Sequence, residues 1–288
     1  MAVYICSKPL QIMVALILAK PNEDALYLVD WFSDAGRIAA SPALGQRFSE
    51  VKLFQSRARA MLAAMKNRYR QVYIDSDIGF KSYLCMILLK IFGCKLIAVY
   101  EEGVGTYRDD LILGWRKFFF RIFNGSCYFG QSPLVGKVVV FDSLRYQTLF
   151  PESSSKVVQI PSLLQPWCEK NIELLKDIFA PGFVIDMPTN TSLRVYLTDW
   201  SVDLNLIKLL SREGELYVKP HPHIREGALV EYQGYYPSVK WVHASIPAEL
   251  FFVLALNAQN NLKVYHYGSS AIFYFSSYAM TNILLDRK

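Results

Sequence analysis

Short apolar runs rich in β-branched and aromatic residues alternate with helical patterns along almost the whole chain. This alternation constrains the fold more than any other feature, because it is typical of a parallel β-sheet covered by helices. In the first half we expect strands at Val3–Cys6, Leu26–Val29, Val51–Phe54, Val72–Asp75, Lys95–Val99 and Lys137–Phe141. Helices are expected between them at Gln11–Ala19, Arg57–Asn67, Phe80–Phe92 and Leu111–Phe123. The sequence therefore predicts the α/β class.

The alternation stops between residues 151 and 188, where five prolines and the run Ser153-Ser154-Ser155 surround one helix-like piece at Trp167–Ile178. Such punctuation is typical of a linker between domains. Beyond it the pattern resumes with strands at Leu193–Leu197, Leu216–Val218, Val239–Val242 and Leu262–His266, and helices at Val202–Arg212, Ala248–Ala258 and from Ser269 onward. We expect a lobe over residues 1–155, a linker over 156–190 and a lobe over 191–288, with ligands bound in a cleft at the carboxyl ends of strands.

Composition excludes several classes of protein. The net charge of +6 is spread over 288 residues without a nucleic-acid-binding fingerprint, so no nucleic-acid partner is expected. Five cysteines without a C-x-x-C pair suggest neither a zinc site nor a disulfide framework, and favour a reducing compartment. Lys8-Pro9 interrupts the opening apolar run, which argues against a signal peptide and for the cytoplasm. Lys90 and Lys95 interrupt the stretch from Ser82 to Tyr100, which predicts a buried helix and a strand instead of a membrane span.

Carboxylates follow two of the expected strands. Glu101 and Glu102 follow the strand at Lys95–Val99 after one residue, Tyr100, and precede Gly103, and Asp199 follows Leu193–Leu197. A carboxylate at a strand end can take a proton from a substrate hydroxyl. The same residues also suit a solvated turn or, for Asp199, the N-cap of the next helix, and the pattern alone leaves both options open.

Two other strand ends carry groups suited to a phosphate. Prolines on both sides of His221 fix the backbone there, and Lys219 adds a positive charge. Gly268, Ser269 and Ser270 precede an apolar helix, where backbone N–H groups and hydroxyls can hold an anion or simply cap the helix. A metal pair of His221 with His223 is not favoured, because no Cys/His cluster supplies further ligands. A carboxylate base, an imidazole acid and a phosphate cradle together suit displacement of a phosphate leaving group by a hydroxyl.

In their order along the chain, these segments resemble the motifs of bacterial sialyltransferases, most closely glycosyltransferase family 52, the lipooligosaccharide sialyltransferases. The matching residues are Glu101-Glu102-Gly103 for the acid-acid-glycine motif, His221-Pro222 for the His-Pro motif and Ser269-Ser270 for the Ser-Ser motif. The opening Tyr4-Ile5-Cys6-Ser7-Lys8-Pro9-Leu10-Gln11 is similar to the start of that family, a strand followed by a turn. The resemblance runs from residue 4 to residue 270, and its specificity comes from the order of short motifs.

The resemblance implies a GT-B-type pair of Rossmann-like lobes with a cleft between them. It implies transfer of sialic acid from CMP-sialic acid, with inversion and without metal or other cofactor, to a galactose-type hydroxyl of a surface glycan or glycolipid. The implied acid is His221, and the implied base is Asp199, with Glu102 close behind and Glu101 as a further candidate. Residues implied to bind the donor phosphate are Ser269, Ser270, Lys219, Pro222 and Gly268. Residues of the implied acceptor or donor loop are Ser7, Pro9, Gln11 and Gly103.

Rival interpretations remain at this point. Asp75-Ser76-Asp77 is a D-x-D sequence, which GT-A-type transferases use for a metal and a nucleotide diphosphate. Transferases of Kdo or another CMP-activated nonulosonic acid share Lys-Pro-His-Pro-like segments. The stretch Trp115–Phe123 mixes cations with large apolar groups. It suits peripheral contact with the inner face of a bacterial membrane and equally a buried helix whose basic side chains extend to solvent. A non-catalytic membrane- or nucleic-acid-binding protein is a remote alternative, and the sequence leaves open whether the chain forms a homodimer.

Overall fold

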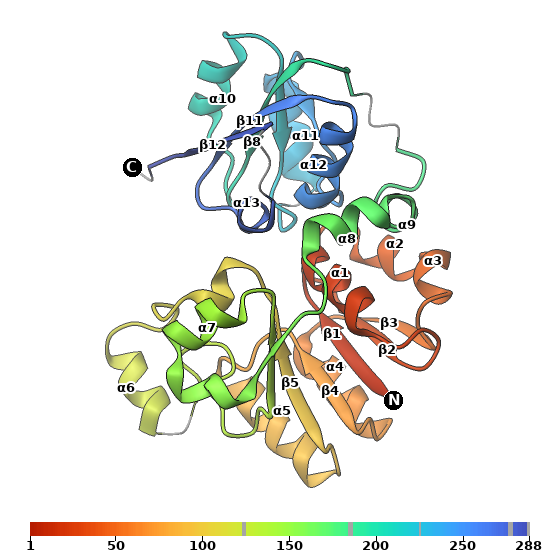
Figure 1. Cartoon of the computed structure of the whole chain (residues 1–288), viewed down its shortest axis with the longest axis vertical. Helices are drawn as coiled ribbons and strands as arrows, with labels where there is room; N and C mark the ends of the chain where they lie inside the picture. Colours follow the sequence, from red (N-terminus) through yellow and green to blue (C-terminus); the bar gives the residue numbers. More distant parts are fainter. Residues whose placement is uncertain (123–124, 184–186, 225, 276–278, 287–288) are drawn as a thin grey trace. The chain divides into compact units, whose positions relative to one another are not determined.

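The computed structural model describes residues 1–122, 125–183, 187–224, 226–275 and 279–286 (Figure 1). The chain divides into two compact units, which we describe separately. Unit 1 comprises Met1–Trp31 and Ala35–Leu163, and unit 2 comprises Phe32–Asp34 and Leu164–Lys288.

Unit 1 is built on a seven-stranded parallel sheet in the order β3-β2-β1-β4-β5-β6-β7. Its strands are β1 (Ala2–Cys6), β2 (Ala25–Val29), β3 (Glu50–Phe54), β4 (Gln71–Ile74), β5 (Leu96–Tyr100), β6 (Lys137–Val140) and β7 (Val157–Gln159). Every residue of β1 and β2 is buried, as expected for central strands covered on both faces, and this is why they show as continuous apolar runs in the sequence.

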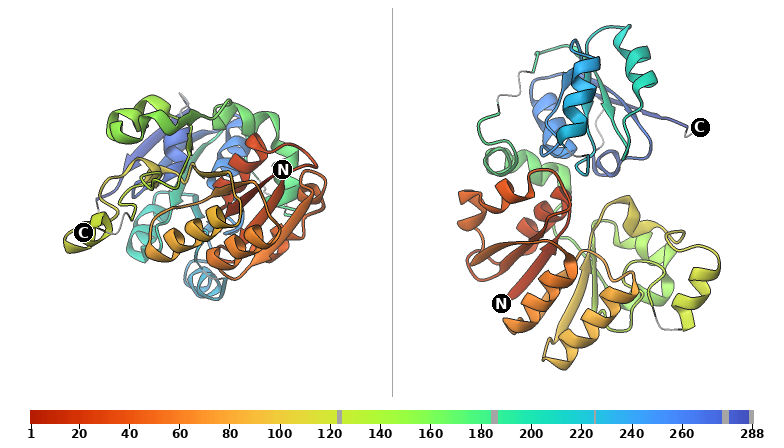
Figure 2. Two further views of the ribbon diagram at one scale, coloured as in Figure 1. Left: turned by 90° about the horizontal axis from the view of Figure 1, so that it is seen from below. Right: turned by 180° about the vertical axis from the view of Figure 1, so that it is seen from behind.

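Short and medium helices connect these strands. They are α1 (Pro9–Leu18), α2 (Ala35–Ala39), α3 (Pro42–Gly45), α4 (Arg57–Lys66), α5 (Phe80–Ile91), α6 (Trp115–Ile122), α7 (Ser143–Leu149) and the 3₁₀ turns η1 (Val104–Tyr107) and η2 (Pro151–Lys156). Pro9 occupies the first turn of α1, where a missing N–H costs nothing. Helices α4 and α5 lie side by side (Figures 1 and 2).

Unit 2 contains a five-stranded parallel sheet in the order β10-β9-β8-β11-β12. Its strands are β8 (Ser192–Leu197), β9 (Leu216–Lys219), β10 (Lys240–Trp241), β11 (Asn261–His266) and β12 (Met280–Leu284). Its helices are α8 (Leu164–Lys170), α9 (Ile172–Phe179), α10 (Leu204–Ser211), α11 (Glu226–Tyr235), α12 (Ala248–Asn257) and α13 (Ser270–Tyr274). Apolar side chains from β8, β9 and α10 form part of its core, among them Tyr196, Ile207 and Val218.

Both sheets reverse their strand order at one point, between β1 and β4 in unit 1 and between β8 and β11 in unit 2. In open α/β sheets, ligands bind outside the carboxyl ends of the strands at such a point. The predicted α/β class with two Rossmann-like lobes is confirmed. The fold also marks one candidate ligand edge in each unit.

The segment expected to be a linker, 156–190, is largely structured. Its first part forms β7 at the edge of the first sheet, and α8 and α9 belong to unit 2. The contact boundary after Leu163 falls inside the expected range. The closing helix expected from Ser269 is α13, which ends at Tyr274, and β12 then adds a parallel strand beside β11. Helix α13 ends because Phe275 has an extended backbone, which stops its hydrogen-bond ladder.

One apolar helix differs from expectation. The helix in Ser82–Tyr100 was expected to be buried, but α5 buries only Ser82, Met86 and Leu89 and exposes large apolar side chains on its outer face. In α6, Trp115 and Phe118 are exposed, and Phe123, the last residue of the expected membrane contact, lies outside the described residues. No helix within the described part of the chain has the length and apolar character needed to cross a bilayer.

Asp77 anchors the loop that leads to β6. Its carboxylate is fully buried and accepts hydrogen bonds from Ser126 Oγ (2.6 Å) and from the backbone N–H groups of Gly130 (2.9 Å) and Ser132 (3.1 Å). Burial raises the pKa of Asp77 despite these donors. This carboxylate therefore holds the loop 126–132 against the end of β4.

We expect Asp77→Ala to lower the free energy of unfolding by about 1–3 kcal/mol, because it leaves three buried donors without an acceptor. Urea denaturation of the purified protein measures this. Glu152→Ala, which removes an exposed carboxylate, should leave the midpoint unchanged. Equal midpoints for Asp77→Ala and the wild type would contradict the anchoring role.

Candidate functional site

In unit 2, three neighbouring strands end at the same level. Leu197 of β8 is paired with Lys219 of β9 and with His266 of β11. Asp199, His221 and the turn at Gly268–Ser269 therefore follow one edge of the sheet, at the point where the strand order reverses. The structure thus brings together the three expected groups of unit 2 at the level of the strand ends.

His221 is held by its backbone and by its ring. Its N–H donates to Thr198 Oγ1 (2.8 Å), which ties the turn after β9 to the end of β8. The imidazole stacks on the indole of Trp200, with ring centroids 5.2 Å apart and an interplanar angle of 22°. His223 completes the group, with its ring 4.8 Å from that of Trp200 and 5.0 Å from that of His221.

The hydrogen bonding also selects a tautomer of His221. The backbone N–H of His223 donates to His221 Nδ1 at 3.3 Å. Because a nitrogen that accepts a hydrogen bond carries no proton, the neutral ring carries its proton on Nε2. Nε2–H is thus the group by which His221 can act as a hydrogen-bond donor or acid. Pro222, next in the chain, accepts at its carbonyl from the N–H of Ser33 (2.7 Å), a residue of the short segment assigned to this unit.

Asp199 lies in the loop between β8 and α10 and is partly exposed. The structure excludes the N-cap option for it, because α10 begins at Leu204 and its N-cap is Asp203. Asp203 Oδ1 accepts from the N–H of Leu206 (3.0 Å), and its Oδ2 accepts from the hydroxyl of Tyr267 (3.0 Å). Asp203 therefore caps α10 and fixes the turn after β11, and Asp199 has no capping role.

The turn after β11 is organised by a histidine that sequence reasoning missed. His266 Nδ1 accepts from the N–H groups of Gly268 (3.0 Å) and Ser269 (3.3 Å), and burial lowers the pKa of His266, which favours the neutral, accepting ring. Ser269 Oγ accepts from the N–H of Ala271 (3.4 Å) and caps α13. Two N–H groups expected for a phosphate are thus bound to His266. The only sequence signal for this role is the place of the histidine at the end of a strand, just before Gly-Ser-Ser.

Lys219 was expected to bind the donor phosphate, but its ammonium group faces the interior. It is 4% exposed, and Nζ donates to the carbonyls of Pro220 and of Ala244 (3.2 Å). Burial lowers its pKa to about 7, which the nearby carboxylate of Glu249 partly offsets. The structure therefore corrects the expectation that Lys219 binds the phosphate. Its ammonium group binds backbone carbonyls inside unit 2 and stabilises the turn that carries His221 and Pro222.

In unit 1, the acid-acid-glycine segment separates into a buried and an accessible carboxylate. Glu101 is fully buried and accepts from Tyr107 OH (2.8 Å) and from the N–H groups of Phe141 (3.1 Å) and Gly103 (3.3 Å). It joins the ends of β5 and β6, so Glu101 is corrected from candidate base to structural anchor. Glu102 is partly exposed and forms an ion pair with Lys8 Nζ.

The glycines of this segment have identifiable functions. Gly103 has φ +110°, a conformation that L side chains rarely adopt. At Gly105 a Cβ atom would lie 2.2 Å from Glu102 Oε2, so only glycine leaves the carboxylate in its place. The pattern Glu-Glu-Gly-x-Gly therefore sets the position of Glu102.

The expected N-terminal loop joins a wider polar network at the carboxyl ends of β1 and β4. Gln11 Oε1 accepts from the N–H of Ser7 (2.8 Å), and Ser7 Oγ donates to Asp75 Oδ2 (2.5 Å). Arg57 donates to both oxygens of Asp75 (2.5 and 2.7 Å), and its guanidinium lies over the ring of Trp31. Ser7 and Gln11 are buried, so they shape this edge from within.

The D-x-D sequence does not form one cluster. Asp75 binds Arg57 and Ser7, whereas Asp77 holds the loop 126–132. Within the described ranges, no group of three His, Cys, Asp or Glu side chains is arranged to hold a metal ion. Sequence reasoning missed Lys8 and Arg57, whose partners lie 94 and 18 residues away in the chain.

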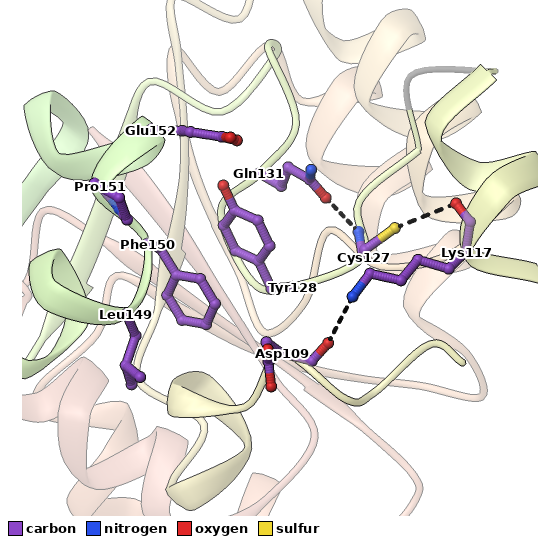
Figure 3. Close-up of a pocket in the computed structure, with 9 residues that line it drawn as sticks. All are labelled: Asp109, Lys117, Cys127, Tyr128, Gln131, Leu149, Phe150, Pro151 and Glu152. Carbon is purple, nitrogen blue, oxygen red and sulfur yellow. Dashed lines mark hydrogen bonds between the residues drawn. The ribbon is translucent and has the colours of Figure 1, made fainter. Parts of the chain in front are cut away.

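A separate small pocket lies among the loops of unit 1 (Figure 3). Its volume is about 170 Å³, below the roughly 300 Å³ at which ligand pockets usually begin. Tyr128 and Phe150 stack in it, with ring centroids 4.2 Å apart. Its lining residues are Asp109, Lys117, Cys127, Tyr128, Gln131, Leu149, Phe150, Pro151 and Glu152. None of the expected site residues belongs to this pocket.

Comparison with known proteins gives a structural likeness. No family model matches the chain, and no curated protein matches it. Among solved structures, a glycosyltransferase from Rickettsia africae ESF-5 superposes with a TM-score of 0.50 and 11% sequence identity, over 99% of this chain and 84% of that one. At this identity the likeness shows a shared fold.

Proposed function

We propose that the chain is a glycosyltransferase that moves sialic acid from CMP-sialic acid to a galactose-type hydroxyl of a bacterial surface glycan, with inversion and without metal. The observation that carries the proposal is the common edge of unit 2. There β8, β9 and β11 end at the same level, and Asp199, His221 and the turn at Ser269 follow these strand ends. The fold shared with a protein described as a glycosyltransferase supports the same class of reaction.

The proposed reaction uses the groups of this edge as acid and base. The acceptor hydroxyl oxygen forms a bond to the anomeric carbon while the bond from that carbon to the phosphate oxygen breaks. Asp199 takes the hydroxyl proton, and the Nε2–H of His221 donates to the departing phosphate oxygen. The hydroxyls of Ser269 and Ser270 add hydrogen bonds to the phosphate, with Gly268 and Pro222 shaping the loops around it.

Asp199 is preferred to Glu102 as the base because it shares a unit with His221. Asp199 follows Thr198, whose hydroxyl holds the backbone of His221. Glu102 belongs to unit 1, where it is paired with Lys8. We propose that this edge of unit 1 shapes the acceptor site. It includes Ser7, Pro9, Gln11 and Gly103.

We expect the purified protein to release CMP from CMP-sialic acid when a galactose-terminated acceptor is added, at an equal rate with and without EDTA. Chromatography of the nucleotide products measures this. The expectation follows because an imidazole and hydroxyls can neutralise the charge that develops on a monophosphate leaving group. Loss of activity in EDTA that Mg²⁺ restores would contradict the metal-free reaction.

The Lys219–Pro222 segment favours one second candidate, a transferase of Kdo or another CMP-activated nonulosonic acid. The same assay separates the two when CMP-Kdo replaces CMP-sialic acid. Faster release from CMP-Kdo would assign the chain to that class. No release from any CMP-activated keto acid, with any acceptor, would remove the transferase proposal.

A further inference from the structure

The outer face of α5 carries an apolar stripe, formed by Phe80, Leu84, Leu88, Ile91 and the C-cap residue Phe92. The exposed fractions of Phe80 and Ile91 are 61% and 71%, and Leu84, Leu88 and Phe92 are exposed as well. The spacing of four, four and three residues places the first four on one face, opposite the buried Ser82, Met86 and Leu89. At 1.5 Å per residue the α5 stripe is about 16 Å long.

The sequence around the α5 stripe is strongly cationic. From Gln55 to Ala98 the chain has eight Lys/Arg and two Asp, a formal charge of +6 that equals the net charge of the whole protein. Both acids, Asp75 and Asp77, are buried and hydrogen-bonded within unit 1. The surface of this segment therefore presents no exposed carboxylate.

The cations lie beside the stripe in space as well as in sequence. Lys81 is exposed on α5 itself, and Lys90 Nζ donates to the carbonyl of Lys95 (3.1 Å). The N–H of Lys95 donates in turn to the carbonyl of Arg70 (2.8 Å). Arg70 is itself exposed, and the remaining exposed cations are on or just after α4, the neighbour of α5 (Figures 1 and 2): Arg59, Lys66 and Arg68. The helix thus has an apolar face with a basic rim.

We propose that the α5 stripe and its basic rim form a docking surface for an anionic lipid bilayer, with α5 lying in the plane of the interface. A helix with large apolar groups on one face and Lys/Arg beside it binds in this way. Each Lys or Arg near an anionic surface strengthens binding by about fivefold. A second copy of the chain is a poorer occupant, because two-fold pairing of the stripes would place cation against cation.

This proposal moves the main membrane contact from α6 to α5. The sequence of Trp115–Phe123 is also aromatic and basic, and Trp115 and Phe118 are exposed. The α5 proposal concerns membrane binding alone, so its test is independent of the transferase reaction. If the acceptor is lipid-linked, docking through α5 would hold the enzyme at the surface that carries it.

Vesicle sedimentation tests the proposal without donor or acceptor. We expect the wild type to sediment at low salt with vesicles of phosphatidylethanolamine and phosphatidylglycerol, and to stay in the supernatant with phosphatidylcholine. The double variant Leu84→Glu with Leu88→Glu should lower the partition coefficient more than tenfold, and Lys81→Glu with Lys95→Glu should lower it to a similar extent. Both double variants change exposed residues, so we expect both to fold. The midpoint of urea denaturation of each variant checks this.

Two control variants locate the contact. Leu144→Glu places the same charge at a 74% exposed leucine of α7 and should leave binding unchanged. Phe118→Glu tests α6 and should change binding less than the α5 variants do. The proposal is overturned if the wild type does not bind anionic vesicles, or if Phe118→Glu abolishes binding while the α5 double variant keeps it. A dimer in light scattering that the α5 double variant dissociates would assign the stripe to a second copy instead.

Discussion

Replacing His221 by alanine is expected to slow the transfer of sialic acid by about 10²–10⁴-fold in kcat, the usual contribution of a general acid. In the proposed reaction the Nε2–H of this ring is the donor to the leaving phosphate, and its proton is placed on Nε2 because Nδ1 accepts from the N–H of His223. The measurement is CMP release at saturating donor and acceptor. The loss should appear in kcat, with a small change in KM, because the developing phosphate charge exists only in the transition state.

His223 supplies a matched control for this prediction. Its ring belongs to the same stack on Trp200, two residues along the chain. His223→Ala keeps its backbone N–H and therefore keeps the hydrogen bond to His221 Nδ1. We expect it to retain most of the activity, and a urea midpoint for each variant separates chemistry from folding. Near-normal kcat in His221→Ala would remove the acid role from this residue.

The second large effect is expected at the base. Asp199→Asn keeps the size of the side chain but cannot accept the hydroxyl proton, so kcat should again fall by about 10²–10⁴-fold. Glu102→Gln should mainly weaken acceptor binding, because Glu102 belongs to the polar edge of unit 1 and is paired with Lys8. CMP release at saturating donor and acceptor measures kcat for both variants, and the rate at varied acceptor concentration measures the acceptor KM.

Gly105→Ala gives an independent check on Glu102. The added methyl would lie 2.2 Å from Glu102 Oε2, so this variant displaces the carboxylate while keeping its charge. With Asp199 as base, Gly105→Ala and Glu102→Gln should behave alike, with altered acceptor KM. If instead Glu102→Gln shows the large loss in kcat and Asp199→Asn does not, the base belongs to unit 1.

Central strands could be predicted from the sequence because burial on both faces leaves an unbroken apolar signal. The expected Leu26–Val29 corresponds to β2 at Ala25–Val29, and the expected Val3–Cys6 to β1 at Ala2–Cys6. The end of the chain was harder to predict. The short β12 has only exposed and half-buried residues and follows a five-residue helix, so a continuing apolar helix fits the local pattern equally well.

The site, too, could be predicted from the sequence only in part. Motifs at strand ends were predictable because the end of a strand shows as a change in hydropathy, but the direction of each side chain was not. Successive residues at a strand end point to opposite sides, so Glu101 is buried while Glu102 next to it is accessible. His266, Lys8 and Arg57 act through tertiary contacts, which no local spacing reveals.

The stacking of Trp200 on His221 gives the protein an intrinsic optical probe. The indole is 69% exposed and close to two imidazoles, and a protonated imidazole quenches indole emission. Fluorescence followed during an acid titration would therefore record the charge state of the His221 and His223 imidazoles directly, without a substrate. The variant Trp200→Phe measures the background emission of the other four tryptophans.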